Sequence, residues 1–145
     1  MKPTSPKKRV SSFLRNHTSA IDIMQDKDLA KLGDAYINFT YSLAESYRRG
    51  RGSNIRVKTK TLSESLKNAR LRILMPKRTP IHDQADAVEA LAAYSWLTDA
   101  LSLEECVSIL SEEGKEDAEL FTKLIEEIMR RLEPSIGKTN TVQGY

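Results

Sequence analysis

Hydrophobic residues recur every three or four positions in several stretches of this chain, which is the spacing that places side chains on one face of an α-helix. The longest stretch predicts a helix over residues 27–49. Its apolar residues at this spacing are Leu29, Leu32, Tyr36, Phe39, Leu43 and Tyr47. Asp26 is a suitable N-cap for this helix, and Gly50 is a suitable stop after its basic last turn.

The same spacing predicts four further helices, over residues 61–73, 81–100, 103–112 and 116–132. In the first of these we expect the inward side chains to be Leu62, Leu66, Ala69 and Ile73. In the last, one stripe holds Phe121, Leu124, Ile125, Ile128 and Leu132. Ser102 and Glu105 have the spacing of a capping box. No stretch has a convincing strand pattern, so the predicted fold class is an all-α helical bundle.

The bundle is expected to form one domain over residues 11–133, beginning with a short helix over 11–17. Residues 1–10 are rich in Lys, Pro and Ser and are predicted to be a flexible basic tail. Residues 134–145 follow the last helix and are predicted to be a flexible C-terminal tail.

Composition narrows the possible classes of protein. With 145 residues, 39% of them hydrophobic, the chain can bury one core, and its net charge of +3 is compatible with a nucleic-acid partner. Cys106 is the only cysteine, which excludes an intrachain disulfide and favours a reducing, cytoplasmic location. No apolar stretch is long enough for a membrane span, and none resembles a signal peptide.

Two of the predicted helices contain an isolated acid among apolar residues. Asp34 is the only charged residue in 32–44, and Glu89 is the only one in 87–97. A helix that is apolar nearly all round is typical of a buried helix, so both carboxylates are expected to lie at or near the core. Asp86 precedes Glu89 by three residues, which places both acids on one helical face together with the small residues Ala90 and Ala93.

Buried carboxylates need a compensating charge, because an isolated ionised acid is costly to remove from water. A divalent cation would provide that charge, since Mg²⁺ prefers carboxylate oxygens and can activate water beside a phosphate. An internal ion pair with a Lys or Arg is the alternative for any single acid. Three acids on two buried helices favour the metal.

The segment that follows the longest predicted helix is strongly basic. Its cations are Arg48, Arg49, Arg51, Arg56, Lys58 and Lys60. Such a segment suits contacts with the phosphates of an A-form duplex, and the alternative is a solvated basic loop.

Three short motifs in order resemble the ribonuclease III family. Residues 32–35 (LGDA) are similar to the core of that family's signature helix, and residues 86–91 (DAVEAL) are similar to its D-x-x-E-A-L helix. Between them, Val57 to Leu62, followed by Ala69 and Leu71, is similar to the family's V-S-N-x-x-L segment. The resemblance covers roughly residues 27–100.

The resemblance implies an endonuclease-domain-like helical fold and a homodimer with a basic valley that binds double-stranded or structured RNA. It also implies Mg²⁺ or Mn²⁺ at Asp34, Asp86 and Glu89. An activated water would then hydrolyse the phosphodiester to 5′-phosphate and 3′-hydroxyl ends. We expect no double-stranded-RNA-binding domain after residue 132, as in the short forms of the family.

Two positions depart from the family pattern. Ala30 stands where the family usually has a Glu, four residues before the signature Asp, and Lys31 stands where it has an aromatic residue of the dimer interface. The missing acid motivates an alternative function, a non-catalytic RNA-binding or scaffold protein on the same fold. A further alternative is an HD-type phosphohydrolase using His82 and Asp83, for which His17 is the only other histidine.

Overall fold

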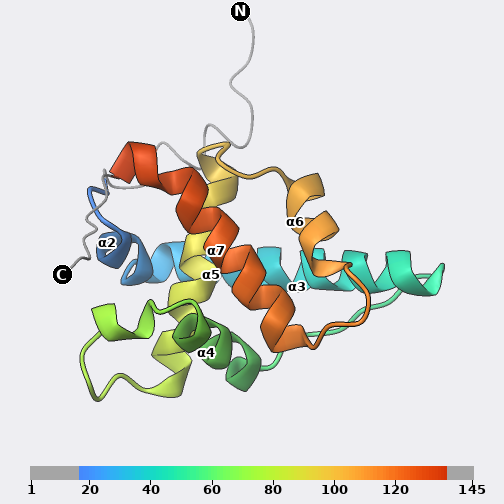
Figure 1. Ribbon diagram of the computed structural model, residues 1–145, viewed down its shortest axis with the longest axis horizontal. Helices are drawn as coiled ribbons and strands as arrows, with labels where there is room; N and C mark the ends of the chain where they lie inside the picture. The colour runs from blue at the N-terminus through green and yellow to red at the C-terminus, as the bar shows by residue number, and fades with distance from the viewer. Residues whose placement is uncertain (1–16, 137–145) are drawn as a thin grey trace, which may run out of the picture.

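The computed structural model describes residues 17–136, with the side chains of 134–136 excepted. Its helices are α2 (Ala20–Met24), α3 (Lys27–Arg49), α4 (Thr59–Asn68), the 3₁₀ turn η1 (Arg72–Leu74), α5 (Ile81–Leu97), α6 (Leu103–Leu110) and α7 (Asp117–Ile136) (Figure 1). No strand occurs within this part of the chain, and the predicted all-α class is confirmed.

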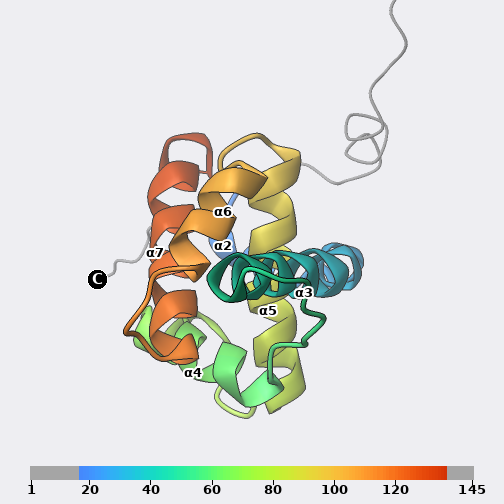
Figure 2. The ribbon, with the colours of Figure 1, turned by 90° about the vertical axis from the view of Figure 1, so that its right-hand side faces the viewer.

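Helix α5 lies at the centre of the bundle and contacts α2, α3, α4 and α7. Helix α3 crosses α5 steeply: Figure 1 draws α3 horizontally with α5 running from top to bottom across it, and Figure 2 shows α3 nearly end-on beside α5. Helix α7 packs on α4, α5 and α6. A central helix with neighbours on most sides must be apolar almost all round.

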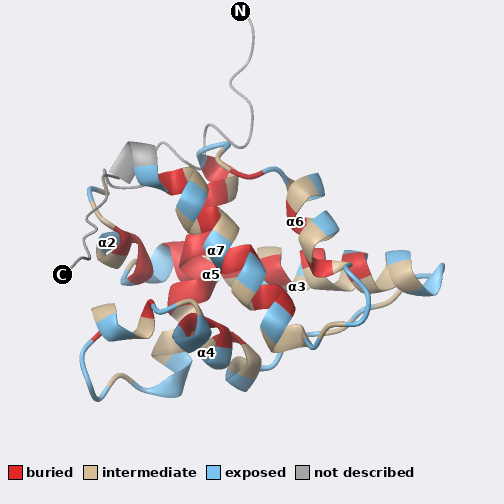
Figure 3. Ribbon diagram, viewed as in Figure 1, coloured by how far each residue is buried: buried red, intermediate tan, exposed pale blue. Residues whose placement is uncertain are grey.

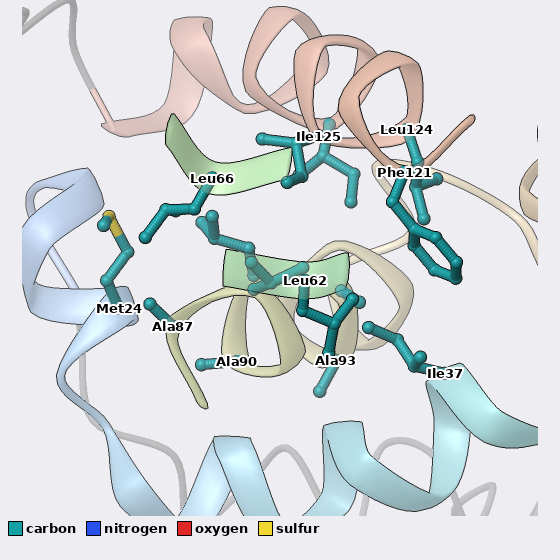
Figure 4. Packing of buried hydrophobic residues seen from close by; sticks show 14 of the residues in the cluster. Met24, Ile37, Leu62, Leu66, Ala87, Ala90, Ala93, Phe121, Leu124 and Ile125 are labelled. Atoms are coloured by element: carbon teal, nitrogen blue, oxygen red, sulfur yellow. The ribbon is translucent and has the colours of Figure 1, made fainter. Parts of the chain in front are cut away.

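The core fills the space between α4, α5 and α7. Ten of the 17 residues of α5 are buried, as predicted for this helix (Figure 3). The apolar stripe of α7 is buried as well: Ile125 lies toward Leu66 of α4, and the ring of Phe121 points toward Ile37 of α3 (Figure 4). Facing them, α5 contributes small alanines, which let its neighbours approach its backbone closely.

The predicted helix ends are confirmed wherever a capping residue marked them. Asp26 is the N-cap of α3, and its Oδ1 accepts hydrogen bonds from the backbone N–H groups of Asp28 and Leu29, each at 3.0 Å. Gly50 ends α3 in the left-handed region, with φ of 71°. Ser102 and Glu105 form the predicted capping box of α6.

The predicted helix over 61–73 is wrong at both ends. Helix α4 begins at Thr59 and ends at Asn68, where Arg70 adopts a φ of 65° and the backbone N–H of Leu71 donates to the carbonyl of Leu66 at 3.1 Å. This left-handed helix end buries Leu71 beneath it. Ile73 therefore does not point inward, and is 84% exposed.

Other boundaries also differ from the prediction. Helix α5 ends at Leu97 rather than near residue 100, because Asp99 takes a left-handed φ of 62°. Helix α2 has no counterpart in the prediction, and α7 continues to Ile136. The predicted tails over 1–10 and 134–145 and the short helix over 11–17 lie largely outside the described residues.

Helix α3 is not buried all round, contrary to the prediction. Its core face holds Leu29, Ala30, Gly33, Ile37, Thr40 and Ala44. A second apolar stripe, here called the outer stripe, holds Leu32, Tyr36, Phe39, Leu43 and Tyr47. Within it Phe39 is 56% and Tyr47 78% exposed. The chain covers the outer stripe only in part: Leu32 and Tyr36 pack against the core, whereas Phe39, Leu43 and Tyr47 remain exposed.

Gly33 lies where α3 crosses α5. A Cβ atom on Gly33 would stand 1.9 Å from the backbone carbonyl oxygen of Glu89, far inside any allowed contact. The two helix backbones therefore touch at this point, which only glycine permits. The small residues Ala90 and Ala93 are buried on the same helix.

We expect Gly33→Ala to lower the free energy of unfolding by about 3 kcal/mol or more, because the helices would have to separate. Alanine normally stabilises a helix relative to glycine by about 0.5–1 kcal/mol, so the sign itself is informative. Urea denaturation of the variant beside the natural protein measures the difference. Gly52→Ala is the matched control, since no atom lies within 4 Å of that Cβ position. Equal stability of both variants would contradict the backbone contact.

Candidate functional site

The crossing of α3 and α5 brings the predicted acids together. Asp34 directly follows Gly33 on α3, and Glu89 is the residue whose backbone Gly33 touches on α5. Asp86 lies one turn before Glu89 on the same face of α5. The close contact of the two helices therefore places acids from both on one side of the crossing.

Glu89 is the buried member of this group, with only 9% of its surface exposed. Burial, the negative charges of Asp34 and Asp86 and a hydrogen bond with Asp34 together raise the pKa of Glu89 to about 8, with burial the largest cause. The negative charges of the other two carboxylates therefore both oppose the ionisation of Glu89.

Asp34 is half-exposed, so its predicted burial is wrong. Its side chain is 48% exposed and pairs with the guanidinium of Arg56 at 3.1 Å. The side-chain amide of Asn38 also donates to Asp34 Oδ1 at 2.9 Å. Asp34 lies at the rim because it does not belong to the buried face of α3: it is turned by about 100° from Gly33, which does.

Asp86 also lies at the rim, with its side chain 34% exposed. The ammonium group of Lys27, from the first turn of α3, donates to Asp86 Oδ2 at 3.0 Å and to Asp83 Oδ1 at 3.0 Å. The site thus consists of one buried acid and two rim acids, each of which faces a basic side chain from another segment.

The donor set suits a hard divalent cation, since every side chain in it offers carboxylate oxygens. Within residues 17–136 no three Asp, Glu, His or Cys side chains stand close enough to hold a metal in this conformation. Arg56 and Lys27 engage the two aspartates instead.

An extended segment brings Arg56 to the site. Three polar side chains of α3, spaced four residues apart, bind the backbone of this segment at every second residue. The contacts are Ser46 Oγ with the N–H of Ser53 at 2.8 Å, Ser42 Oγ with the N–H of Ile55 at 2.9 Å, and Asn38 Oδ1 with the N–H of Val57 at 2.8 Å. Four helical residues rise about 6 Å and two extended residues span about 6.6 Å, so the repeats match.

The matching repeat fixes which side chains of the segment point outward. Ile55 and Val57 are half-buried against the helix, whereas Arg56 and Lys58 are exposed; Lys60 is exposed as well, but it lies in the first turn of α4. These three cations are predicted from the sequence, whereas the polar residues of α3 that hold the segment are not. A signal existed: Asn38, Ser42 and Ser46 are polar residues at four-residue spacing on an otherwise apolar helix.

The other predicted cations, Arg48, Arg49 and Arg51, lie at the end of α3 and directly after it, and they differ in their contacts. Arg48 donates to the carbonyl of Leu110 at 2.6 Å and pairs with Glu45, and its side chain is only 20% exposed. Arg49 also pairs with Glu45, at 2.9 Å. Arg51 is exposed. Arg48 therefore joins α3 to the end of α6 and is poorly placed for an external phosphate.

The histidines do not form an HD-type arrangement. The ring of His17 contacts Asp26 Oδ2 at 3.0 Å and packs edge-on against Tyr94. His82 is an exposed residue in the first turn of α5, which matches its simplest interpretation as a helix-start residue.

The outer stripe borders two shallow apolar hollows. One, of about 310 Å³, is lined by Leu32, Ala35, Tyr36, Phe39, Ala93, Trp96 and Leu103. The other, of about 330 Å³, is lined by Leu43, Tyr47, Leu103, Glu104, Val107, Ser108 and Ser111. The outer stripe and the two hollows together form one surface. On it, exposed aromatic side chains lie beside hollows that are lined mainly by apolar residues.

Comparison with known proteins gives one family. A family model described as ribonuclease III matches residues 27–139. No curated protein matches the chain. Among the described residues, no helix has the length and apolar character needed to cross a membrane.

Because Glu89 ordinarily ionises near 4.5 but holds its proton up to about 8 in the fold, the metal-free protein should lose stability as the pH rises between these values. In this window the unfolded chain releases the proton and the folded chain retains it. Glu89→Gln removes this loss, worth on the order of 2 kcal/mol after allowing for solvent near the rim. Urea midpoints in chelator, at about pH 5 and about pH 8.5, measure it.

Glu113→Gln is the control for that comparison, since Glu113 is an exposed glutamate away from the acids. Its stability difference from the natural protein should not change with pH. If Glu89→Gln behaved in the same way, the interpretation of Glu89 as a protonated acid would be wrong.

Proposed function

Because the chain belongs to the ribonuclease III family, we propose that it is a metal-dependent endoribonuclease that cleaves double-stranded or structured RNA. The observation that carries this proposal is the meeting of Asp34, Asp86 and Glu89 at the crossing of α3 and α5. Family membership supports a nuclease in general, and the three acids support metal-dependent hydrolysis in particular.

In this proposal Asp34, Asp86 and Glu89 hold Mg²⁺ or Mn²⁺. A cation near Glu89 lowers its pKa again, so binding the metal and releasing the Glu89 proton are coupled. When bound, the metal lowers the pKa of water and stabilises the negative charge that develops on the phosphate. Asn38 keeps Asp34 oriented through its hydrogen bond to Oδ1.

The reaction is a hydrolysis. The oxygen of water forms a bond to phosphorus, the bond from phosphorus to the 3′ oxygen breaks, and that oxygen leaves with a proton. The products carry a 5′-phosphate and a 3′-hydroxyl. Arg56, whose guanidinium lies beside Asp34, is placed to donate hydrogen bonds to phosphate oxygens next to the cleaved bond.

The RNA contacts follow from the extended segment. Arg56 and Lys58 point outward from a backbone that α3 holds at Ile55 and Val57, and the exposed Lys60 follows in the first turn of α4, so these charges form a row rather than a mobile loop. Such a row suits the evenly spaced phosphates of a duplex, where shape and backbone dominate recognition. Arg49 and Arg51 extend the positive charge at the end of α3. Cys106 is buried and free, in keeping with the cytoplasm as the proposed location.

We also propose that the active form is a homodimer joined through the outer stripe. The outer stripe presents Phe39 and Tyr47 beside apolar hollows on the same surface, which is the arrangement that a twofold axis makes self-complementary. Lys31 stands where the family has its interface aromatic, so Phe39 is the anchor that we propose in this chain.

The second candidate is a non-catalytic RNA-binding protein on the same fold. The specific observation that favours it is Ala30, a buried alanine at the position where the family usually has a fourth acid. The cleavage experiment below separates the two candidates.

A labelled RNA hairpin should be cut in Mg²⁺ or Mn²⁺ and left intact in chelator. Asp34→Asn, Asp86→Asn and Glu89→Gln should each lower the cleavage rate by roughly a hundredfold or more, because each removes a ligand that acts in the transition state. Single-turnover rates measure the effect, with Glu113→Gln as the control. Binding of the hairpin without any metal-dependent cutting would favour the non-catalytic candidate.

Phe39→Asp should convert the dimer into single chains, because it places a charge at the centre of an apolar interface. Sedimentation equilibrium measures the mass. Ile73→Asp is the matched control, since Ile73 is also an exposed apolar residue but lies outside the outer stripe. A natural protein that sediments as one chain, or a Phe39→Asp variant that remains a dimer, would exclude this interface.

A further inference from the structure

The side-chain amide of Asn38 joins the acids to the basic segment. Its Nδ2 donates to the backbone carbonyl of Asp34 at 2.7 Å and to Asp34 Oδ1 at 2.9 Å. Its Oδ1 accepts the backbone N–H of Val57 at 2.8 Å. These partners fix the orientation of the amide, because a backbone N–H only donates, whereas carbonyl and carboxylate oxygens accept.

The contacts of Asn38 close a ring around Arg56. Val57 directly follows Arg56, whose Nη2 donates to the same oxygen of Asp34 at 3.1 Å. On the other side of Arg56, the N–H and the carbonyl of Ile55 both bond Ser42 Oγ, each at 2.9 Å. The backbone on both sides of Arg56 is therefore held by α3, and its guanidinium is held at Asp34.

Ser42 and Ser46 hold the same segment in a different way. Ser42 Oγ bonds the backbone of Ile55 alone, and Ser46 Oγ accepts from the N–H of Ser53 and donates to the carbonyl of Ser42, each at 2.8 Å. In these contacts both hydroxyls bond backbone groups, whereas the Asn38 amide also bonds a carboxylate. The connection between the segment and the acids therefore depends on Asn38 and on Arg56 itself.

Arg56 keeps donors for RNA while it pairs with Asp34. Its side chain is 71% exposed, and its bond to Asp34 uses Nη2. A guanidinium has further N–H donors on its other two nitrogens, so it can hold a phosphate and a carboxylate together. A phosphate bound by Arg56 would then lie at a set distance from the acids.

We propose that Asn38 is a positioning residue that determines where the RNA strand is cut. It joins Asp34 to the backbone next to Arg56, and so fixes the spacing between the phosphate that Arg56 contacts and the acids. Without Asn38 the segment shifts relative to Asp34, and neighbouring phosphodiesters compete for cleavage. This inference rests on the proposed function, because it assumes that these acids act on the cleaved bond.

Mapping the cut positions tests this role with Asn38→Ala. A hairpin RNA labelled at one end is cleaved in Mn²⁺ under single-turnover conditions, and its fragments are resolved to the nucleotide. The share of the main cut should fall roughly threefold, with new cuts at neighbouring positions, because the contact couples two groups of the site. A loss of stability alone would slow all cuts equally and leave their distribution unchanged.

A second measurement needs neither cleavage nor RNA. In chelator, hydrogen exchange of the Val57 amide should be roughly tenfold faster in Asn38→Ala, because the bond that protects it is lost. Asn38→Asp keeps an acceptor for Val57 but places a like charge beside Asp34. It should keep the exchange rate and the cut position of the natural protein, and should slow the cutting.

Ser46→Ala is the matched control. It also removes one hydrogen bond to the segment, at Ser53, but it leaves both sides of Arg56 held. This variant should cut at the same positions as the natural protein and should exchange the Val57 amide at the natural rate.

An unchanged distribution of cuts in Asn38→Ala would overturn the role of Asn38, as would an equal spread of cuts in Ser46→Ala. Unchanged exchange of Val57 in Asn38→Ala would overturn the contact on which the role depends. A natural protein that cuts no hairpin in Mg²⁺ or Mn²⁺ would overturn the proposed function and this role with it. Failure of the role alone is recognised by a natural protein that cuts and an Asn38→Ala variant that cuts at the same positions.

Discussion

The contact between the backbone of Gly33 and the carbonyl of Glu89 is the constraint on which the rest of the structure depends. Two helices can touch at their backbones only where neither carries a side chain between them. Because Gly33 provides this at the crossing, α5 can lie directly against α3 and still accept α4 and α7 on its other sides. The residues next to the contact, Asp34 and Glu89, then have to be neighbours.

This geometry separates the acids by environment. Glu89 lies beneath the crossing and loses most of its contact with water, whereas Asp34 and Asp86 remain at the rim. A rim acid can exchange one positive partner for another at little cost, because solvent reaches it. A buried acid, by contrast, either keeps its proton or needs a cation beside it. The site therefore combines one buried acid, Glu89, which needs a positive charge when it is ionised, with two rim acids, Asp34 and Asp86, which can change their positive partners.

The sequence predicts the parts of this arrangement that depend on local rules. Capping residues and helical spacing identify α3 from Asp26 to Gly50, and the near absence of charge identifies α5 as buried. Order and spacing of short motifs identify the acids. Ile73 was misassigned because a left-handed turn at Arg70, which periodicity does not reveal, brings Leu71 into the core instead.

The remaining differences between the prediction and the structure depend on contacts between residues that are far apart in the sequence. The near absence of charge predicts that α3 is buried, but it does not reveal which sides of the helix the chain covers, so the expected burial of Asp34 is wrong. The pairing of Lys27 with Asp83 and Asp86 joins residues more than 50 positions apart, and no local pattern reports it. The hydrogen bonds from Asn38, Ser42 and Ser46 had a visible spacing, but their partner segment did not.

Three faces of helix α3 have different roles: one packs in the core, one holds the basic segment, and one is the proposed dimer surface. The angular order of these faces explains why the roles do not interfere. Successive helical residues turn by about 100°, so the polar row from Asn38 to Ser46 lies roughly half a turn from the core face around Gly33, and the outer stripe around Phe39 lies between the two on one side of the helix. Asp34 falls between the core face and the polar row. A second chain packed on the outer stripe would therefore leave Asp34 and the basic segment open to a ligand.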